Sequence, residues 1–145
     1  MRALEDRDIN AVLAIQAASP EAAQWKVADH GLGRSPSAFT WVAEHAGSVE
    51  GFLVARQAAD EFEILNLAVA PRSRRQGVAT ALLGAALANA KKFGAKQAYL
   101  EVRASNSGAI GFYVRHGFQA TGRRKGYYFS PLDDALILSF ELPGG

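Results

Sequence analysis

The chain has 145 residues, of which 49% are hydrophobic and 21% charged, and its formal net charge is +2 at pH 7. This is the composition of an ordinary globular protein, and we expect residues 1–145 to form a single domain. Because the sequence contains no cysteine, disulfides, a thiolate nucleophile and thiolate metal ligands are excluded. No apolar run reaches the length of a membrane span, and the charged N-terminus lacks the apolar core of a signal peptide. We therefore expect a cytoplasmic protein that does not bind a membrane.

The N-terminal region predicts a short strand and two helices. The strand is expected at residues 2–4, and Asp6 is expected to cap a helix with one apolar face. Ser19-Pro20-Glu21 predicts the start of the second helix, because serine is a good N-cap and proline fits the first helical position. We expect this helix to continue through Val27.

The rest of the chain predicts further strands and two more helices. Gly94 and Gly117 are suited to ending these helices, since glycine readily adopts the left-handed conformation that follows many helix C-termini. Several antiparallel strands around one parallel strand–helix–strand crossover predict an α/β fold with a mixed, mostly antiparallel sheet. The predicted strands are residues 39–44, 49–55, 62–69, 97–103, 118–124 and 135–142, and the predicted helices are residues 77–93 and 107–116.

The most informative stretch joins the predicted strand at 62–69 to the predicted helix at 77–93. The strand is almost entirely apolar near its end, and Pro71 stops it because proline cannot donate a ladder hydrogen bond. A short basic loop follows. At the start of the helix, free backbone N–H groups and the helix dipole attract an anion, and Gly77 allows close approach of a ligand to the backbone. The sequence therefore predicts a phosphate-binding loop made of main chain.

The type of phosphate-binding loop can be narrowed by its residues. A nucleotide P-loop requires a Lys-Ser or Lys-Thr pair, and a dinucleotide fingerprint requires three glycines, whereas this loop contains only Gly77. The run Arg-Arg-Gln-Gly-Val-Ala at 74–79, after Val69-Ala70-Pro71, resembles the pyrophosphate loop of the GNAT acyltransferase superfamily. That superfamily binds acetyl-coenzyme A (acetyl-CoA). An ordinary solvated basic loop is the alternative interpretation.

A second motif follows the next strand, at Glu101-Val102-Arg103-Ala104-Ser105-Asn106. The carboxyl ends of parallel strands lie side by side, where α/β sheets usually bind ligands. Together the two motifs resemble the RimI-like branch of the GNAT superfamily, the N-terminal acetyltransferases of ribosomal-protein alanine. Residues 123–128 and Asp134-Ala135 also match that branch. The resemblance covers residues 62–142, and the first sixty residues match only loosely.

The resemblance implies a role for each matching residue. Glu101 would be the general base, Tyr113 the general acid, and Asn106 would hydrogen-bond the coenzyme near its pantetheine arm. The thioester and the pantetheine arm would be held by the strand-end backbone of Leu67, Ala68 and Val69, and the pyrophosphate would be wrapped by Arg75, Gln76, Gly77, Val78, Ala79 and Thr80.

These residue types suit the chemistry of amine acetylation. A carboxylate can take the proton of the attacking amine, and a phenol that is neutral at pH 7 can donate to the departing thiolate. The sequence has no cysteine and shows no recognisable Ser-His-Asp arrangement. We therefore expect direct transfer of the acetyl group from the cosubstrate acetyl-CoA to the amine, in a ternary complex. His30, His45 and His116 are scattered along the sequence, so we predict no metal.

Each candidate residue also has a structural interpretation. Glu101 could form a surface ion pair, and Glu63 is a rival base because histone-acetylating relatives have a glutamate at the equivalent point. Tyr113 could pack in the core, and Asn106 is equally suited to cap the following helix. The basic run at 123–125 is either a solvated turn or a patch that attracts an acidic substrate. Tyr127 and Tyr128 are expected in a loop that lines a peptide groove.

Acceptor choice is the least determined property. The resemblance favours the N-terminal α-amine of a protein, with a ribosomal protein as the first candidate. The alternatives are a small amine, such as an amino acid, polyamine or aminoglycoside, and a coenzyme-binding module without turnover. The presence of both Glu101 and Tyr113 disfavours such a module. We expect no nucleic-acid partner, because the basic loop fits a pyrophosphate better. The sequence does not determine the oligomeric state.

Overall fold

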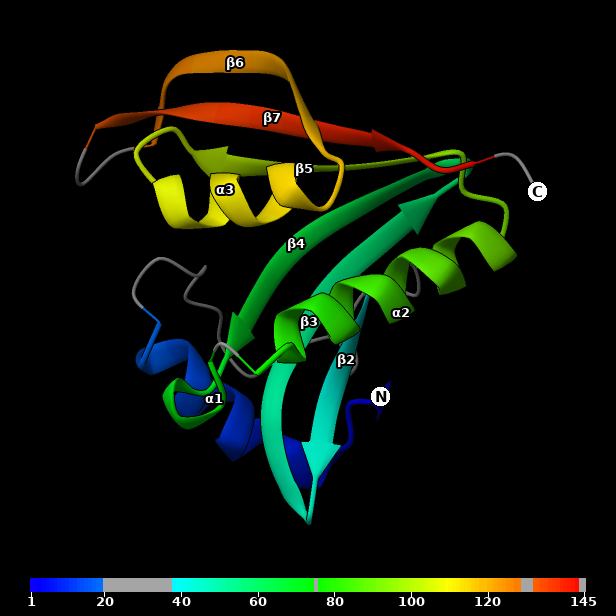
Figure 1. Cartoon of the computed structure of the whole chain (residues 1–145), viewed down its shortest axis with the longest axis vertical. Coiled ribbons are helices and arrows are strands. Elements are labelled where there is room, and N and C mark those ends of the chain that lie inside the picture. The colour runs from blue at the N-terminus through cyan, green and yellow to red at the C-terminus, as the bar shows by residue number, and fades with distance from the viewer. Residues whose placement is uncertain (20–37, 75, 129–131, 144–145) are drawn as a thin grey trace.

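The structure, a computed structural model, describes residues 1–19, 38–74, 76–128 and 132–143. A seven-stranded sheet with the order β1-β2-β3-β4-β5-β7-β6 carries helices on both faces (Figure 1). Among the strand pairs of the described residues only β4–β5 is parallel, so the predicted mixed, mostly antiparallel sheet is confirmed. The strands are β1 Arg2–Ala3, β2 Ala38–His45, β3 Ser48–Ala58, β4 Glu61–Val69, β5 Gln97–Arg103, β6 Gln119–Tyr128 and β7 Asp133–Glu141. The helices are α1 Ile9–Ala17, α2 Val78–Lys92 and α3 Ser107–Arg115, with short 3-10 turns η1 Asp6–Asp8 and η3 Pro71–Ser73.

The two faces of the sheet carry separate apolar cores. Leu53 of β3 packs with α2 and with Tyr113 of α3 in one core. Its neighbour Phe52 packs with Val12 of α1 in the other core. Because successive side chains of a strand point to opposite faces, α1 lies on one face of the sheet, and α2 and α3 lie on the other. We call these the α1 face and the α3 face.

A β-bulge in β4 positions the functional region. Val54 of β3 pairs with Asn66, whereas Ala55 pairs with Ile64, so Leu65 is an extra residue in β4. A bulge bends its strand and increases the local twist. The parallel pairing of β4 with β5 ends at Ile64 opposite Leu100, beside the bulge. Both strands continue beyond that point, so the sheet splits between them.

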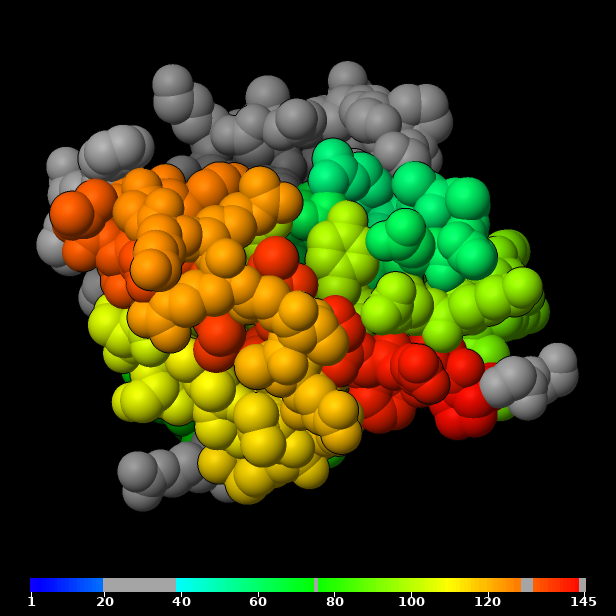
Figure 2. All heavy atoms as spheres, turned by 90° about the horizontal axis from the view of Figure 1, so that it is seen from above, coloured from blue at the N-terminus to red at the C-terminus, as the bar shows by residue number. Residues whose placement is uncertain are grey.

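The β6 strand differs from its prediction. It reaches Tyr128, so Tyr127 and Tyr128 belong to the strand rather than to a loop, and residues 123–125 are not a turn. β6 is an edge strand whose residues are mostly exposed, and Figure 2 shows it across the surface above β7. Two register shifts against β7 and the basic residues at 123–125 protect this edge from pairing with other chains.

The start of α1 also differs from its prediction, because Asp6 is not its cap. Asp6 begins η1, and the carboxylate of Asp8 accepts the N–H of Glu5 at 2.8 Å. Asp8 is 4% exposed, and the Arg2 guanidinium donates to its two oxygens at 2.7 and 2.9 Å. The predicted second helix falls within residues 20–37, outside the described residues.

Replacing Asp8 with asparagine is expected to lower the free energy of unfolding by about 2 kcal/mol at pH 7, since a charged hydrogen-bond pair is lost. The hydrogen bond from Arg2 holds the pKa of Asp8 below its usual value. A lowered carboxyl pKa contributes stability above the unfolded-state pKa, and this contribution is lost as pH falls. The difference from wild type, measured by urea unfolding, should therefore shrink below about pH 4. Asp6→Asn, at an exposed neighbour, is the control, and a pH-independent difference would contradict the prediction.

Candidate active site

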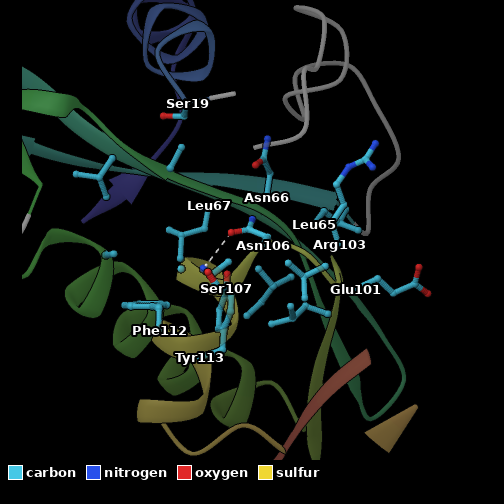
Figure 3. A pocket seen from close by; sticks show the side chains of 18 of the residues that line it. Ser19, Leu65, Asn66, Leu67, Glu101, Arg103, Asn106, Ser107, Phe112 and Tyr113 are labelled. Carbon is cyan, nitrogen blue, oxygen red and sulfur yellow. Dashed lines mark hydrogen bonds between the residues drawn. The ribbon is translucent and has the colours of Figure 1, made fainter. Parts of the chain in front are cut away.

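A groove of about 1030 Å³ fills the split between β4 and β5 (Figure 3). Its walls come from the end of β4, which has no partner on its β5 side among the described residues, from the end of β5, and from the first half of α3. Backbone groups along an unpaired strand end can bind a ligand as they would bind a neighbouring strand. The sequence placed these two strand ends side by side, whereas the bulge separates them and creates space for a ligand.

Glu101 and Tyr113 both line this groove, but they reach it from opposite faces of the sheet. Leu100 and Val102 belong to the core under α2 and α3, so Glu101, between them on β5, lies on the α1 face. Tyr113 belongs to α3. Figure 3 shows the Tyr113 side chain beside α3 and the Glu101 side chain extending from β5 on the side away from α3. The Glu101 carboxylate therefore reaches the groove from the α1 face, and the Tyr113 phenol reaches it from the α3 face.

Tyr113 is both a core residue and a groove residue. Its side chain is 6% exposed, and its ring makes edge contacts with Phe112 and Phe118 at centroid distances of 5.2 and 5.3 Å. Burial raises the pKa of Tyr113, so its hydroxyl stays protonated at neutral and moderately alkaline pH. Among the described residues its hydroxyl has no hydrogen-bond partner. It is therefore available to donate to a ligand in the groove.

The two candidate bases have different surroundings. Glu101 lines the groove, and its Oε1 lies 3.4 Å from Nη2 of Arg124, so it also forms an ion pair, the alternative interpretation considered for it. Glu63 lies in the paired part of the strands, opposite Tyr99, and forms an ion pair with Arg56. Glu63 is not among the described residues that line the groove. The geometry thus favours Glu101 as the carboxylate that can meet a ligand.

In the described part of the loop between β4 and α2, both arginine side chains bond to the protein and the main chain begins the helix. Gly77 is the N-cap of α2 and has φ +80°, the left-handed conformation that favours glycine. A Cβ at Gly77 would meet no atom within 4 Å, so its backbone conformation, not crowding within the protein, requires glycine. Arg72 donates to the Val49 carbonyl at 3.0 Å, and Arg74 is likewise hydrogen-bonded within the protein. The helix begins at Val78, one residue after its predicted start.

The predicted coenzyme-binding residues fall into three groups. Leu67, Ala68, Val69, Ala79 and Asn106 line the groove. Gln76, Gly77, Val78 and Thr80 lie at the N-terminus of α2 outside the groove lining, and Arg75 is outside the described residues.

Two of these side chains are already engaged in the protein. Thr80 contacts Nε2 of His116 at 3.1 Å, and Nδ1 of His116 donates to the Phe112 carbonyl at 2.8 Å. Asn106 caps α3 as predicted, since its Oδ1 accepts the Ala109 N–H at 3.2 Å. This bond uses the oxygen of the Asn106 side chain and leaves its amide N–H groups to act as donors.

The groove also contains polar residues that sequence reasoning missed. Asn66 is 6% exposed and lines the groove from β4. Its signal in the sequence was a single amide within an otherwise apolar run. Arg103 lines the groove from β5, and its guanidinium lies 4.5 Å from the ring centre of Tyr128, another lining residue. Tyr127 packs edge-on against Tyr128 but is 47% exposed and lies outside the lining.

Comparison with known proteins identifies the class. Residues 8–118 match the family model described as acetyltransferase (GNAT) family. The chain therefore belongs to the GNAT family and is an acetyltransferase, as the sequence resemblance predicted.

Particular relatives narrow the comparison. The chain is 35% identical to the [ribosomal protein bS18]-alanine N-acetyltransferase of Escherichia coli K12 over 98 residues, which cover 66% of each chain. It is 31% identical over 115 residues to the N-alpha-acetyltransferase of Sulfurisphaera tokodaii, covering 70% of this chain and 68% of the relative. The crystal structure of the ribosomal-protein-S18-alanine N-acetyltransferase from Escherichia coli superposes with a TM-score of 0.82 at 28% identity. That superposition covers 97% of this chain and 91% of the other.

Two further observations concern the described residues alone. None of their helices is long and apolar enough to span a membrane. They also contain no group of three or more His, Cys, Asp or Glu side chains arranged to hold a metal ion.

Proposed function

We propose that this protein transfers the acetyl group of acetyl-CoA to the N-terminal α-amine of a protein, with a ribosomal protein that begins with alanine as the first candidate. The observation that carries the proposal is the groove through the split sheet, with Glu101 and Tyr113 on opposite faces. The activities of the Escherichia coli and Sulfurisphaera tokodaii relatives, both N-acetyltransferases, support the choice of acceptor. GNAT acetyltransferases use acetyl-CoA, and the residues around the groove fit such a donor.

The donor would be held largely by main chain. The first-turn N–H groups of α2 after Gly77 suit the diphosphate, because unsatisfied N–H groups and the helix dipole favour an anion. The backbone at 67–69 pairs with β3 but not with β5, and its free side suits the amide groups of the pantetheine arm. The amide N–H groups of Asn106 are suited to donate to a pantetheine carbonyl. A groove of about 1030 Å³ is at the upper end of the usual size for small-molecule sites.

The two faces of the groove would then serve different steps. The acceptor amine approaches on the α1 face, where the Glu101 carboxylate takes its proton directly or through a water. A backbone N–H near Val69 polarises the thioester carbonyl. Tyr113 donates its proton from the α3 face to the departing thiolate. Transfer is direct, so no residue of the protein becomes acetylated on the pathway, and mass spectrometry that trapped such a residue would contradict this mechanism.

Gly77→Val is expected to weaken acetyl-CoA binding about tenfold and to lower stability by about 1–2 kcal/mol, because a β-branched residue is strained at φ +80°. The kcat at saturating acetyl-CoA should change much less. Gly84→Ala is the matched control, since Gly84 lies exposed within α2 with open space around its Cβ. Isothermal titration with acetyl-CoA measures the effect, and equal affinity of Gly77→Val and wild type would contradict the role of this loop.

Thiol release from acetyl-CoA tests the proposed acceptor. A peptide that begins with alanine should be acetylated, whereas the same peptide with a blocked N-terminus and an internal lysine should not be. Free amino acids, polyamines and an aminoglycoside are the competing acceptors. If any of these small amines were acetylated faster than the peptide, the proposed acceptor would be wrong and a small amine would be favoured. Binding of acetyl-CoA without thiol release to any acceptor would instead favour a non-catalytic module.

A further inference from the structure

Arg74 links two walls of the groove that are far apart in the sequence. It is the first residue of the run at 74–79 that resembles the pyrophosphate loop, although the pyrophosphate was assigned to the residues after it. Its Nε donates to the Val69 carbonyl at 3.3 Å, and its Nη2 donates to the Ala18 carbonyl at 3.1 Å and to Oγ of Ser19 at 2.9 Å. The guanidinium therefore binds oxygens of the protein on both sides of the loop.

The partners of Arg74 belong to different structural layers. Val69 is the last residue of β4 and lines the groove, and Ala18 is the C-cap of α1. Ser19 is 6% exposed and also lines the groove. A cation at a helix C-terminus is stabilised by the last carbonyls and by the helix dipole. Arg74 thus joins the end of α1, on the α1 face, to the strand end beside the donor loop.

Arg72 provides the contrast within the same loop. Its Nη2 donates to the Val49 carbonyl at 3.0 Å, and its Nε lies 3.8 Å from Oε2 of Glu50. Both of these contacts are to residues of β3. Neither contact reaches α1. Of these two arginines, only Arg74 connects the donor loop with the end of α1.

We propose that Arg74 is a positioning residue that holds the end of α1 against the donor loop and thereby shapes the acceptor side of the groove. The inference rests on the proposed function, because it assigns the α1 face to the acceptor amine. It assigns Arg74 to carbonyl and hydroxyl oxygens of the protein and not to the phosphates of the donor.

The test compares two donors, acetyl-CoA and S-acetyl-pantetheine, which lacks the diphosphate. Arg74→Ala should raise the KM of an alanine-starting peptide about tenfold with both donors, with a smaller change in kcat. Arg74→Lys should restore part of this loss. Arg72→Ala, which removes the same charge from the same loop, should leave the peptide KM within about twofold. A loss that occurs with acetyl-CoA and disappears with S-acetyl-pantetheine would overturn the proposal in favour of a phosphate contact.

A double-mutant cycle tests the contact with Ser19. Ser19→Ala should raise the peptide KM about threefold in the wild-type background and should add little to Arg74→Ala, because residues that share an interaction are not additive. Full additivity would overturn the link between the two side chains.

Hydrogen exchange tests the same link without turnover. The N–H of Ala18 bonds to the Ala14 carbonyl and the N–H of Ser19 to the Gln16 carbonyl, each at 3.1 Å. Arg74→Ala should increase exchange at these two amides in the substrate-free protein, and Arg72→Ala should not. Unchanged exchange in Arg74→Ala would overturn the link even if peptide acetylation is confirmed. Increased exchange in a protein that acetylates no peptide would support the link and refute the proposed acceptor.

Discussion

Glu101→Gln is expected to lower kcat/KM for the acceptor by a factor of about 10² to 10⁴, the range typical of a general base. Glutamine keeps the shape of the side chain but cannot take a proton. The affinity for acetyl-CoA should change little, because Glu101 lies on the α1 face while the donor loop is formed by main chain at the start of α2. The variant loses the ion pair with Arg124, which is exposed, so stability should change by less than about 1 kcal/mol.

Glu63→Gln is the matched variant, because Glu63 was the rival base and lies on the neighbouring strand. Its removal breaks an ion pair with Arg56 in the closed part of the sheet, so kcat/KM should remain within about threefold of wild type. Initial rates at subsaturating peptide, with acetyl-CoA binding measured by calorimetry, separate the two variants. A larger loss for Glu63→Gln than for Glu101→Gln would reverse the assignment of the base.

The crossover around the groove could be predicted because its signals are local. The run at 97–103 alternates strictly, and β5 has those same bounds. The long helix was predicted within one residue at each end, since Gly77 and Gly94 take positive φ on either side of it. Glu101, Tyr113 and Asn106 were carried over from a family motif, and the structure brings all three to one groove. Their chemical roles remain proposals.

The features that open the groove could not be predicted, because they depend on pairing between distant segments. Leu65 is an ordinary apolar residue in the sequence, and only its register against β3 makes it a bulge. The bonds from Arg74 to Ala18 and Ser19 span more than fifty residues. Tyr127 and Tyr128 were predicted in a loop, but Gly126 takes φ +60° at a register shift and the strand continues beyond it.

Tyr113→Phe is expected to lower kcat about a hundredfold, because the departing thiolate then lacks a proton donor. The ring contacts with Phe112 and Phe118 are kept, so the free energy of unfolding and the affinity for acetyl-CoA should be close to wild type. Since burial raises the pKa of Tyr113 above its ordinary value of about 10, the phenol stays protonated to at least pH 9. Tyr113 should therefore cause no decline in the wild-type rate below that pH.

The measurement is kcat at saturating peptide and acetyl-CoA between pH 6 and 9, with the affinity for acetyl-CoA determined on the same preparations. Tyr99→Phe is the control, because Tyr99 is a tyrosine of β5 that lies outside the groove lining. It should leave kcat within about twofold of wild type. If Tyr113→Phe retained wild-type kcat across this range, the thiolate would have to be protonated by another donor, such as a water in the groove. The placement of Tyr113 on the face of the sheet opposite to Glu101 would then play no part in the reaction.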